Sequence, residues 1–248
     1  MRYFIILSYN GAAFCGWQIQ ENANSVQQEI QNALGILLKE PVTVTGAGRT
    51  DTGVNAIDYV AHFDSTNILK NCPYLCYKLN AILPKEISIS RILPMHPQAH
   101  ARFDATSRCY KYYIHTYKDP FRAGFSYFVK GKPDIEKMNL AAALLLGEHD
   151  FSSFEKVNGG NKTSVCNVME AKWEQISENR YVFTVRANRF LRNMVRAMVG
   201  SLLEVGLGKR EPEWIAQVLS QKERGKAGQS VPGNALFLAD ITYPYSLE

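Results

Sequence analysis

The alternation of apolar and polar residues predicts several short strands along the chain. Residues 2–9 alternate around Tyr3, Ile5 and Leu7, a period of two that is typical of a half-buried strand. Asn10-Gly11 then supplies a turn. Further strands are predicted, from the same period or from β-branched and aromatic residues, at residues 42–45, 59–63, 87–93, 108–117, 172–173, 181–186 and 236–243.

Apolar residues at helical spacing predict helices between these strands. After Ser25, which is a suitable N-cap, apolar side chains recur three or four residues apart as far as Leu37. Further helical or mixed segments are predicted at residues 65–83, 134–146, 190–204 and 212–219. Because strands and helices are mixed without strict βαβ alternation, we expect an α+β fold with a large antiparallel sheet.

Length and composition indicate a folded protein of one large domain or two modest ones. The chain has 248 residues, of which 46% are hydrophobic and 21% charged, so disorder is a poor interpretation of any long stretch. The region around Pro94 and Pro97 resembles a crossover, which divides residues 1–98 from residues 99–248. Lys and Arg (28) exceed Asp and Glu (23) by five, a mild basic bias that is compatible with nucleic acid.

The five cysteines are scattered and odd in number. No secretory signal is recognisable and no apolar run approaches the roughly 20 residues of a membrane helix, so we expect a cytoplasmic protein with reduced thiols and no membrane association. Cys72 and Cys76 form the one close pair. Without a second pair or nearby His ligands they are a weak zinc signal, and we expect buried free thiols and no metal.

The loop between the second and third predicted strands contains the strongest candidate for chemistry. Residues 48–53 read GRTDTG, and the flanking glycines allow a tight backbone that holds Asp51 out from the chain. Arg49 is close enough to orient or balance the carboxylate. Two alternatives are an Asx-turn residue and an aspartic protease triplet, Asp51-Thr52-Gly53. The protease needs two carboxylates that share a proton, and the chain has no second triplet.

The strand predicted at residues 108–117 is a second candidate. Alternation places Tyr110 and Tyr112 on one face, and Cys109 and Lys111 on the other. An aromatic ring beside basic residues is typical of a base-stacking platform, worth roughly 1–3 kcal/mol per stacked base. Packing of one or both tyrosines in the sheet core is the alternative.

Arginines on the helix predicted at residues 190–204 are a third candidate. Arg189, Arg192 and Arg196 fall at i, i+3 and i+7, which places them on one helical face while Met194 and Met198 face the core. Such a row suits phosphate or an acidic active-site residue. A solvated charged face is the alternative.

These segments together resemble the tRNA pseudouridine synthases of the TruA family over nearly the whole chain. The motifs that carry the resemblance, in the family's order, are 9–11 (YNG), 14–18 (FCGWQ), 47–54 (AGRTDTGV), 60–63 (VAHF), 80–84 (NAILP), 100–105 (HARFDA), 147–154 (GEHDFSSF) and 190–200 (FLRNMVRAMVG). Each motif alone is modest evidence, but their common order is hard to obtain by chance.

The resemblance implies an isomerase that detaches uracil from its ribose and rejoins it through carbon 5, at uridines 38 to 40 of the tRNA anticodon arm. Asp51 matches the family's essential aspartate, Tyr110 the tyrosine that stacks on the target base, and Arg196 the arginine that pairs with the aspartate. Arg49 helps to hold the flipped nucleotide, and Arg108, Arg189 and Arg192 are substrate-binding candidates. Extrusion of the uridine costs roughly a few kcal/mol, which stacking and an inserted arginine can offset.

The resemblance further implies two mixed α/β halves that share a joined, mostly antiparallel sheet around a central basic cleft, the pseudouridine synthase fold. It implies tRNA as partner, a homodimer, and no metal, nucleotide or redox cofactor. The basic residues expected to contact phosphate are Lys130, Lys132, Arg186, Arg189, Arg192, Lys209 and Arg210. The alternative from another class is an RNA-binding protein of the same fold without catalysis.

The chain departs from the family pattern near the aspartate. It has Asn10 where the family usually has aspartate, Asn55 where it has histidine, and Tyr59 where glutamine is common, with Asp58 also unusual. Residues 231–236 (VPGNAL) are a loosened form of the family's C-terminal motif. Because the aspartate, tyrosine and arginine are kept, these departures concern which uridines are modified more than the reaction class.

Overall fold

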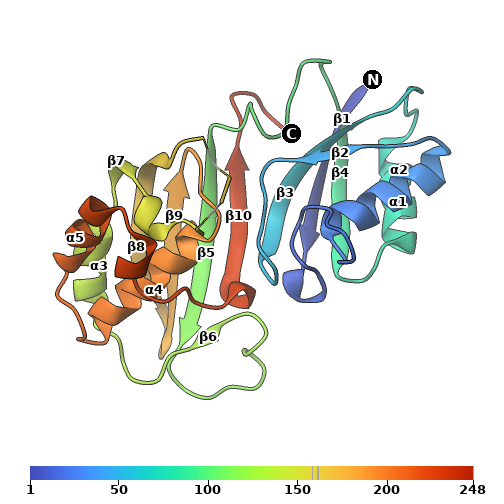
Figure 1. Cartoon of the computed structure of the whole chain (residues 1–248). Helices are drawn as coiled ribbons and strands as arrows, with labels where there is room; N and C mark the ends of the chain where they lie inside the picture. The colour runs from blue at the N-terminus through green and yellow to red at the C-terminus, as the bar shows by residue number, and fades with distance from the viewer. Residues whose placement is uncertain (158, 161, 248) are drawn as a thin grey trace. The chain divides into compact units, whose positions relative to one another are not determined.

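The computed structural model describes residues 1–157, 159–160 and 162–247. The chain forms two compact units, which Figure 1 shows together with their labelled elements. Unit 1 contains residues 1–106 and the C-terminal residues from Leu238 onward, and unit 2 contains residues 107–237. Helices and mostly antiparallel strands are mixed in both, which confirms the predicted α+β class.

The sheet of unit 1 is centred on β1 (Arg2–Tyr9). Its neighbours are β3 (Asn55–Asp64) and β4 (Ile87–Met95), both antiparallel to it, and the short β2 (Val44–Gly46) pairs with β3. Six of the eight residues of β1 are buried, all except Arg2 and Ser8, so the strand is buried on both faces rather than on alternate residues. The strand is therefore more central than its period of two predicted.

Unit 1 also contains two α-helices. Helix α1 (Val26–Leu38) begins at the predicted cap, where Ser25 Oγ accepts a hydrogen bond from the backbone N–H of Gln28 at 3.3 Å. Helix α2 (Cys72–Ile82) is capped in the same way by Asn71. The two helices contact each other, and α2 also packs on β4 (Figure 1).

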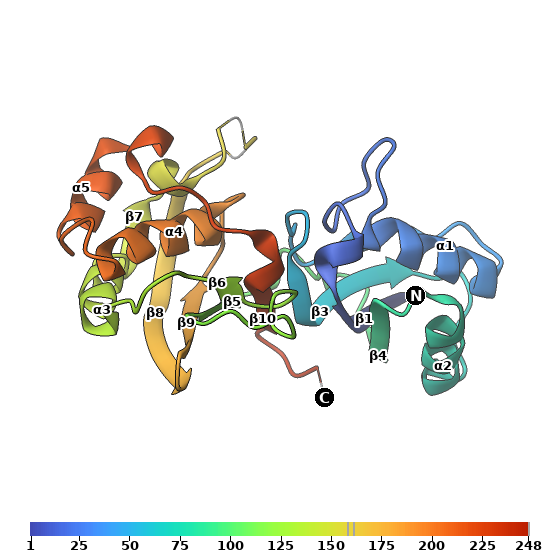
Figure 2. The same ribbon diagram turned by 90° about the horizontal axis from the view of Figure 1, so that it is seen from below.

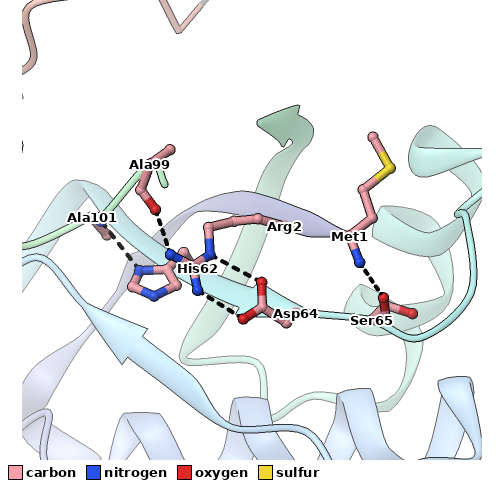
Figure 3. A network of polar contacts seen from close by, with 7 residues as sticks. All are labelled: Met1, Arg2, His62, Asp64, Ser65, Ala99 and Ala101. Atoms are coloured by element: carbon pink, nitrogen blue, oxygen red, sulfur yellow. Dashed lines mark hydrogen bonds and ion pairs between the residues drawn. The ribbon is translucent and has the colours of Figure 1, made fainter. Parts of the chain in front are cut away.

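A polar network ties the segment that follows β4 to the sheet of unit 1, as Figure 3 shows. Arg2 donates two hydrogen bonds to Asp64, at 3.0 and 2.8 Å, and a third to the carbonyl of Ala99 at 2.8 Å. The backbone N–H of Ala101 donates to Nδ1 of His62 at 3.2 Å. Burial lowers the pKa of His62 to about 4, so this ring is neutral and can accept at physiological pH.

The sheet of unit 2 is antiparallel apart from one short strand. Its order is β5 (Ser107–His115), β9 (Arg180–Ala187), β8 (Val165–Ser177) and β7 (Gly147–Asp150). The two-residue strand β6 (Tyr127–Phe128) pairs with β5 in parallel. The last strand of the chain, β10 (Leu236–Thr242), contains the boundary between the two units.

Three helices lie on the same side of β8 and β9 in Figure 2. They are α3 (Ile135–Ala143), α4 (Met194–Gly206) and α5 (Trp214–Gln221). Most of α4 is buried, which agrees with its apolar sequence. Short 3-10 helices complete the chain at Gly11–Ala13, Ser152–Phe154, Arg224–Lys226 and Gly233–Ala235.

The predicted start of α4 at residue 190 was wrong. The helix begins at Met194, because Asn193 adopts the left-handed conformation with φ +69° and interrupts the helical backbone before it. Its side-chain N–H donates to Ser230 Oγ at 2.7 Å, which holds this conformation. Residues 190–193 therefore form a bend rather than the first helical turn.

The five thiols are free, and those of Cys76, Cys109 and Cys166 are buried. Within residues 1–157, 159–160 and 162–247, no group of three or more His, Cys, Asp or Glu side chains is placed to hold a metal ion. In the same residues, no helix combines the length and the apolar character needed to cross a membrane.

Candidate functional site

The Asp51 loop (residues 47–54) connects β2 to β3, as the sequence predicted. Its two ends are fixed by backbone hydrogen bonds, from the N–H of Ala47 to the carbonyl of Val60 at 2.9 Å and from the N–H of Val54 to the carbonyl of Asp51 at 3.1 Å. Gly53 has a φ of +77°, a conformation that favours glycine. Asp51 is half-buried and Arg49 is exposed, so the loop presents both side chains near the surface.

Three buried aromatic residues pack together beside the Asp51 loop. The ring centroid of Tyr59 lies 4.1 Å from that of Trp17 and 5.6 Å from that of Tyr9. The Tyr59 hydroxyl donates to the carbonyl of Gly48, and the Tyr9 hydroxyl is 2.8 Å from Thr50 Oγ1 in a buried hydrogen bond. These bonds satisfy polar groups on both sides of Arg49 and hold the loop in one conformation.

The segment from residue 11 to 17 approaches the loop so closely that only glycine fits at two positions. A Cβ on Gly11 would lie 2.1 Å from the carbonyl oxygen of Val54. A Cβ on Gly16, which has a φ of +93°, would lie 2.4 Å from the carbonyl oxygen of Thr50. The N–H of Trp17 donates to that same oxygen at 3.2 Å. The opening motifs of the chain therefore have a structural role in positioning the loop.

Three of the departures from the family pattern, Asn10, Asn55 and Tyr59, each make a hydrogen bond at or beside this loop. Asn55 Oδ1 accepts from the backbone N–H of Gly11 at 2.9 Å in a buried bond. Asn10 Oδ1 accepts from the N–H of Ala12 at 3.0 Å and begins the 3-10 helix there. Tyr59 makes the bond to Gly48. Asn55 and Tyr59 lie at buried positions of β3, whereas Asn10 is half-buried and follows β1. The sequence linked these residues only to the choice of uridine and did not predict their contacts with the loop.

Tyr110 and Tyr112 on β5 differ in exposure. Tyr112 is fully buried, its hydroxyl donates to the carbonyl of Pro232 at 3.0 Å, and burial raises its pKa. Tyr112 therefore belongs to the core, which was the alternative for these tyrosines. Tyr110 is half-buried and its ring meets that of Phe190 edge to face, with centroids 5.0 Å apart. This contact orients the Tyr110 ring while part of it stays accessible.

Arg196 lies in the first turn of α4 and is half-buried. Its Nε donates to the carbonyl of Val231 at 2.7 Å. Burial raises the pKa of Tyr112, and the positive charge of Arg196 acts in the opposite direction. The segment 231–232 thus contacts both Arg196 and Tyr112.

The remaining arginines do not form the predicted row on one helix. Arg189 and Arg192 precede α4, and only Arg196 is within it, because the helix begins at Met194. Arg108 on β5 donates from Nη1 to the carbonyl of Asn188 at 2.9 Å. Arg108 and Tyr110 are therefore both in contact with the segment that follows β9.

The other basic residues predicted to contact phosphate are mostly on the surface of unit 2. The exposed ones among them are Lys130, Lys132, Lys209 and Arg210. Arg186 is half-buried and donates to Ser107 Oγ at 3.1 Å. Asp51 and Arg49 belong to unit 1, whereas Tyr110 and the other candidate arginines belong to unit 2.

Comparison with known proteins gives consistent results along the chain. The profile of the tRNA pseudouridine synthase family matches residues 141–244. The tRNA pseudouridine synthase A of Parabacteroides distasonis is 52% identical over 246 residues, covering 99% of this chain and 97% of the relative. Those of Bacteroides thetaiotaomicron (50% identical, covering 98% and 91%) and Shewanella amazonensis (40% identical, covering 99% and 94%) are also similar.

The mixed α/β fold with mostly antiparallel strands is consistent with the pseudouridine synthase fold. The extent of the identity shows that the chain belongs to the tRNA pseudouridine synthase A family, a family of isomerases.

Proposed function

We propose that this isomerase converts uridines 38, 39 and 40 of the tRNA anticodon arm to pseudouridine, with Asp51 as the nucleophile. The observation that carries the proposal is the construction of the Asp51 loop. Buried tyrosines hydrogen-bond to both sides of Arg49, and glycines permit the close approach of a second segment, so Asp51 is held in place while its side chain stays half-exposed. Such fixed placement is what a nucleophile requires.

The reaction exchanges one bond for another. Asp51 attacks C1′ of ribose or the uracil ring, and the glycosidic bond between N1 of uracil and C1′ breaks. The uracil then turns, a bond forms between C5 and C1′, C5 loses its hydrogen and N1 gains one. The bond to Asp51 breaks again as the product forms, which returns the free carboxylate. Because there is no net oxidation or hydrolysis, the chemistry requires no redox or nucleotide cofactor, and the mass of the RNA does not change.

A uridine in a helical arm must leave the stack before Asp51 can reach it. We assign stacking on the flipped uracil to Tyr110, whose ring is oriented by Phe190 and remains partly accessible. Arg49 is exposed on the same loop as Asp51 and holds the flipped nucleotide. Arg196 supplies a positive charge as the partner of the Asp51 carboxylate, and its orientation is fixed by the carbonyl of Val231.

Phosphate binding is assigned to basic residues of unit 2, among them Arg108, Arg189 and Arg192. Affinity for tRNA should therefore fall as salt rises, since neutralised phosphates release their counterions. We also propose a cytoplasmic homodimer, by similarity to the family, in which one tRNA contacts both subunits.

The test is incubation of the purified chain with unmodified tRNA transcripts, followed by mapping of pseudouridine. We expect conversion at positions 38, 39 or 40 and none in transcripts with cytidine at all three. Conversion confined to other positions would contradict the assigned substrate. Binding of tRNA without any conversion would instead support the alternative, an RNA-binding protein of this fold without catalysis.

A further inference from the structure

The segment between β5 and α3 exposes Phe121 to solvent, and the proposed function gives this residue no role. Phe121 is 95% exposed, the highest value among the large apolar side chains of the described residues. An exposed apolar side chain alone is ordinary on a protein surface. What distinguishes Phe121 is the structure of the turn that carries it and the charge around it.

Hydrogen bonds fix the turn around Phe121. Asp119 Oδ1 accepts from the backbone N–H of Phe121 at 2.9 Å, and Asp119 Oδ2 forms an ion pair with Arg122 Nε at 2.8 Å. The Tyr117 hydroxyl also donates to Asp119 Oδ2, at 3.0 Å. The N–H of Phe125 donates to the carbonyl of Arg122 at 2.9 Å and closes the turn. An exposed ring on an ordered turn loses little conformational freedom when it binds.

The segment that carries Phe121 has a positive net charge. Residues 117–132 contain four basic side chains, Lys118, Arg122, Lys130 and Lys132, against the single carboxylate of Asp119. The Asp119 carboxylate is already paired with Arg122, and the three lysines are exposed. An exposed ring on a segment with exposed lysines is a combination that suits a nucleobase and its neighbouring phosphates.

The turn is also linked through the chain to Arg196. Asn234 Nδ2 donates to the carbonyl of Ala123 at 2.9 Å, which anchors the turn to the segment 231–234. The same segment accepts hydrogen bonds from Tyr112, at Pro232, and from Arg196, at Val231. The Phe121 turn and the arginine assigned to the catalytic carboxylate therefore share one support.

We propose that Phe121 stacks on an unpaired base of the RNA substrate, outside the reacting uridine, while Lys118 and Lys130 contact the adjoining phosphates. The inference rests on the proposed function for the identity of the RNA. A second copy of this chain is the other candidate for an exposed ring. The charge of the segment favours RNA, because lysine is depleted in protein interfaces and the three exposed lysines on the segment would repel those of a second copy.

The test compares variants of the full chain in equilibrium binding to an unmodified tRNA transcript at one fixed salt concentration. Phe121→Trp keeps a face for stacking, whereas Phe121→Leu keeps apolar character without one. We expect Phe121→Leu to weaken binding about ten-fold and Phe121→Trp to stay within about two-fold of the original chain. The rate at saturating tRNA should be unchanged in both, since Phe121 does not touch the reacting uridine.

Phe128→Leu is the matched control, because the Phe128 ring lies on the same segment but packs on His115, with centroids 5.7 Å apart. It should bind tRNA like the original chain. A melting curve of each variant shows whether the fold is kept, and ultraviolet cross-linking of the original chain to tRNA provides evidence that needs no variant. We expect a cross-linked base on Phe121.

Equal tRNA affinity of Phe121→Leu and the original chain would overturn the proposal, as would a cross-link map without Phe121. A change of oligomeric state in Phe121→Leu, measured by sedimentation without RNA, would assign the ring to a second copy of the chain and also overturn it. Failure of the proposed function is distinct: the original chain would then bind tRNA without converting any uridine, while the affinity comparison would still decide whether Phe121 stacks.

Discussion

At the scale of single residues, the hydroxyl of Tyr59 joins the Asp51 loop to the buried aromatic residues beside it. Tyr59→Phe keeps the ring contact with Trp17 and removes the hydrogen bond to Gly48. We expect the free energy of unfolding to fall by about 1–2 kcal/mol, because the carbonyl of Gly48 loses its buried partner. The rate of uridine conversion at saturating tRNA should fall several-fold as the loop loosens.

Urea unfolding and initial rates measure these two effects. Tyr77→Phe is the control, since Tyr77 is exposed on α2 and belongs to neither the loop nor its supports. An unchanged unfolding midpoint and rate in Tyr59→Phe would show that the hydroxyl does not position the loop.

His62 makes the stability of unit 1 depend on pH. Burial is the main cause that lowers its pKa from 6.5 to about 4, and the nearby Arg2 and His100 lower it further, while Asp64 and Asp104 oppose the shift. The unfolded chain therefore binds a proton more readily than the folded chain. The stabilising contribution is complete above about pH 6.5 and is lost as the pH falls toward 4. Full protonation of His62 lowers the free energy of unfolding by at most about 3 kcal/mol.

His62→Asn tests this origin of the pH dependence. Asparagine keeps an acceptor for the N–H of Ala101 but has no proton to gain in this range. The fall in unfolding free energy between pH 7 and pH 4 should be smaller in the variant than in the original chain. Identical pH profiles would assign the dependence to other groups.

At the scale of elements, two helical glycines are expected to respond in opposite directions to the same substitution. A Cβ on Gly200 of α4 would lie 1.8 Å from the carbonyl oxygen of Gln229, so Gly200→Ala should displace the 228–231 segment and destabilise the chain by more than about 3 kcal/mol. A Cβ on Gly35 of α1 meets only the carbonyl oxygen of Glu40, at 3.5 Å. Gly35→Ala should stabilise by about 0.5–1 kcal/mol.

Thermal unfolding of both variants measures this contrast. If Gly200→Ala has a small effect on the unfolding temperature, the backbone around Gln229 moves away from α4 at a lower energetic cost than we expect.

Most elements were predictable from the sequence, because the period of their apolar residues indicates their type and, for some helices, a capping residue indicates where they begin. Helix α1 begins beside Ser25 and β1 spans residues 2–9, as expected. The start of α4 was not predictable, because the left-handed conformation of Asn193 is held by Ser230, a contact far away in sequence. The short strands β6 and β7 were missed, since two to four residues are too few to show a period.

The position of the Asp51 loop was predictable from the sequence, but the contacts that hold the loop in place were not. The glycines and the neighbouring strands identified the loop. The hydrogen bonds of Tyr9 and Trp17 with Thr50, and that of Asn55 with Gly11, join residues more than thirty positions apart in the chain. The distinction between Tyr110 and Tyr112 also depends on what covers each ring, which alternation along one strand does not reveal.

At the scale of the whole molecule, the C-terminal residues return to unit 1. Leu238, Ile241 and Tyr243 are buried, the Tyr243 ring lies 5.7 Å from that of Phe4, and its hydroxyl donates to the carbonyl of Ala101 at 2.5 Å. A chain that ends at residue 237 loses all of these contacts. Since each buried large side chain contributes about 2–5 kcal/mol, the shortened chain should be largely unfolded at room temperature.

Circular dichroism and thermal unfolding measure the effect of this truncation. A chain that ends at residue 245 is the control, because it keeps the buried residues and should retain most of the stability. A cooperative transition at the original temperature in the shorter chain would show that unit 1 does not depend on its C-terminal strand.

The most direct test of the central claim is the conversion of uridine by Asp51→Asn under single-turnover conditions with unmodified tRNA. Asparagine keeps the size of the side chain and removes the charge, so we expect conversion to fall by at least about a thousand-fold with tRNA binding kept. Asp58→Asn, at an exposed position in the following strand, is the control and should convert at the original rate. Full conversion by Asp51→Asn would contradict the assignment of Asp51 as the catalytic carboxylate.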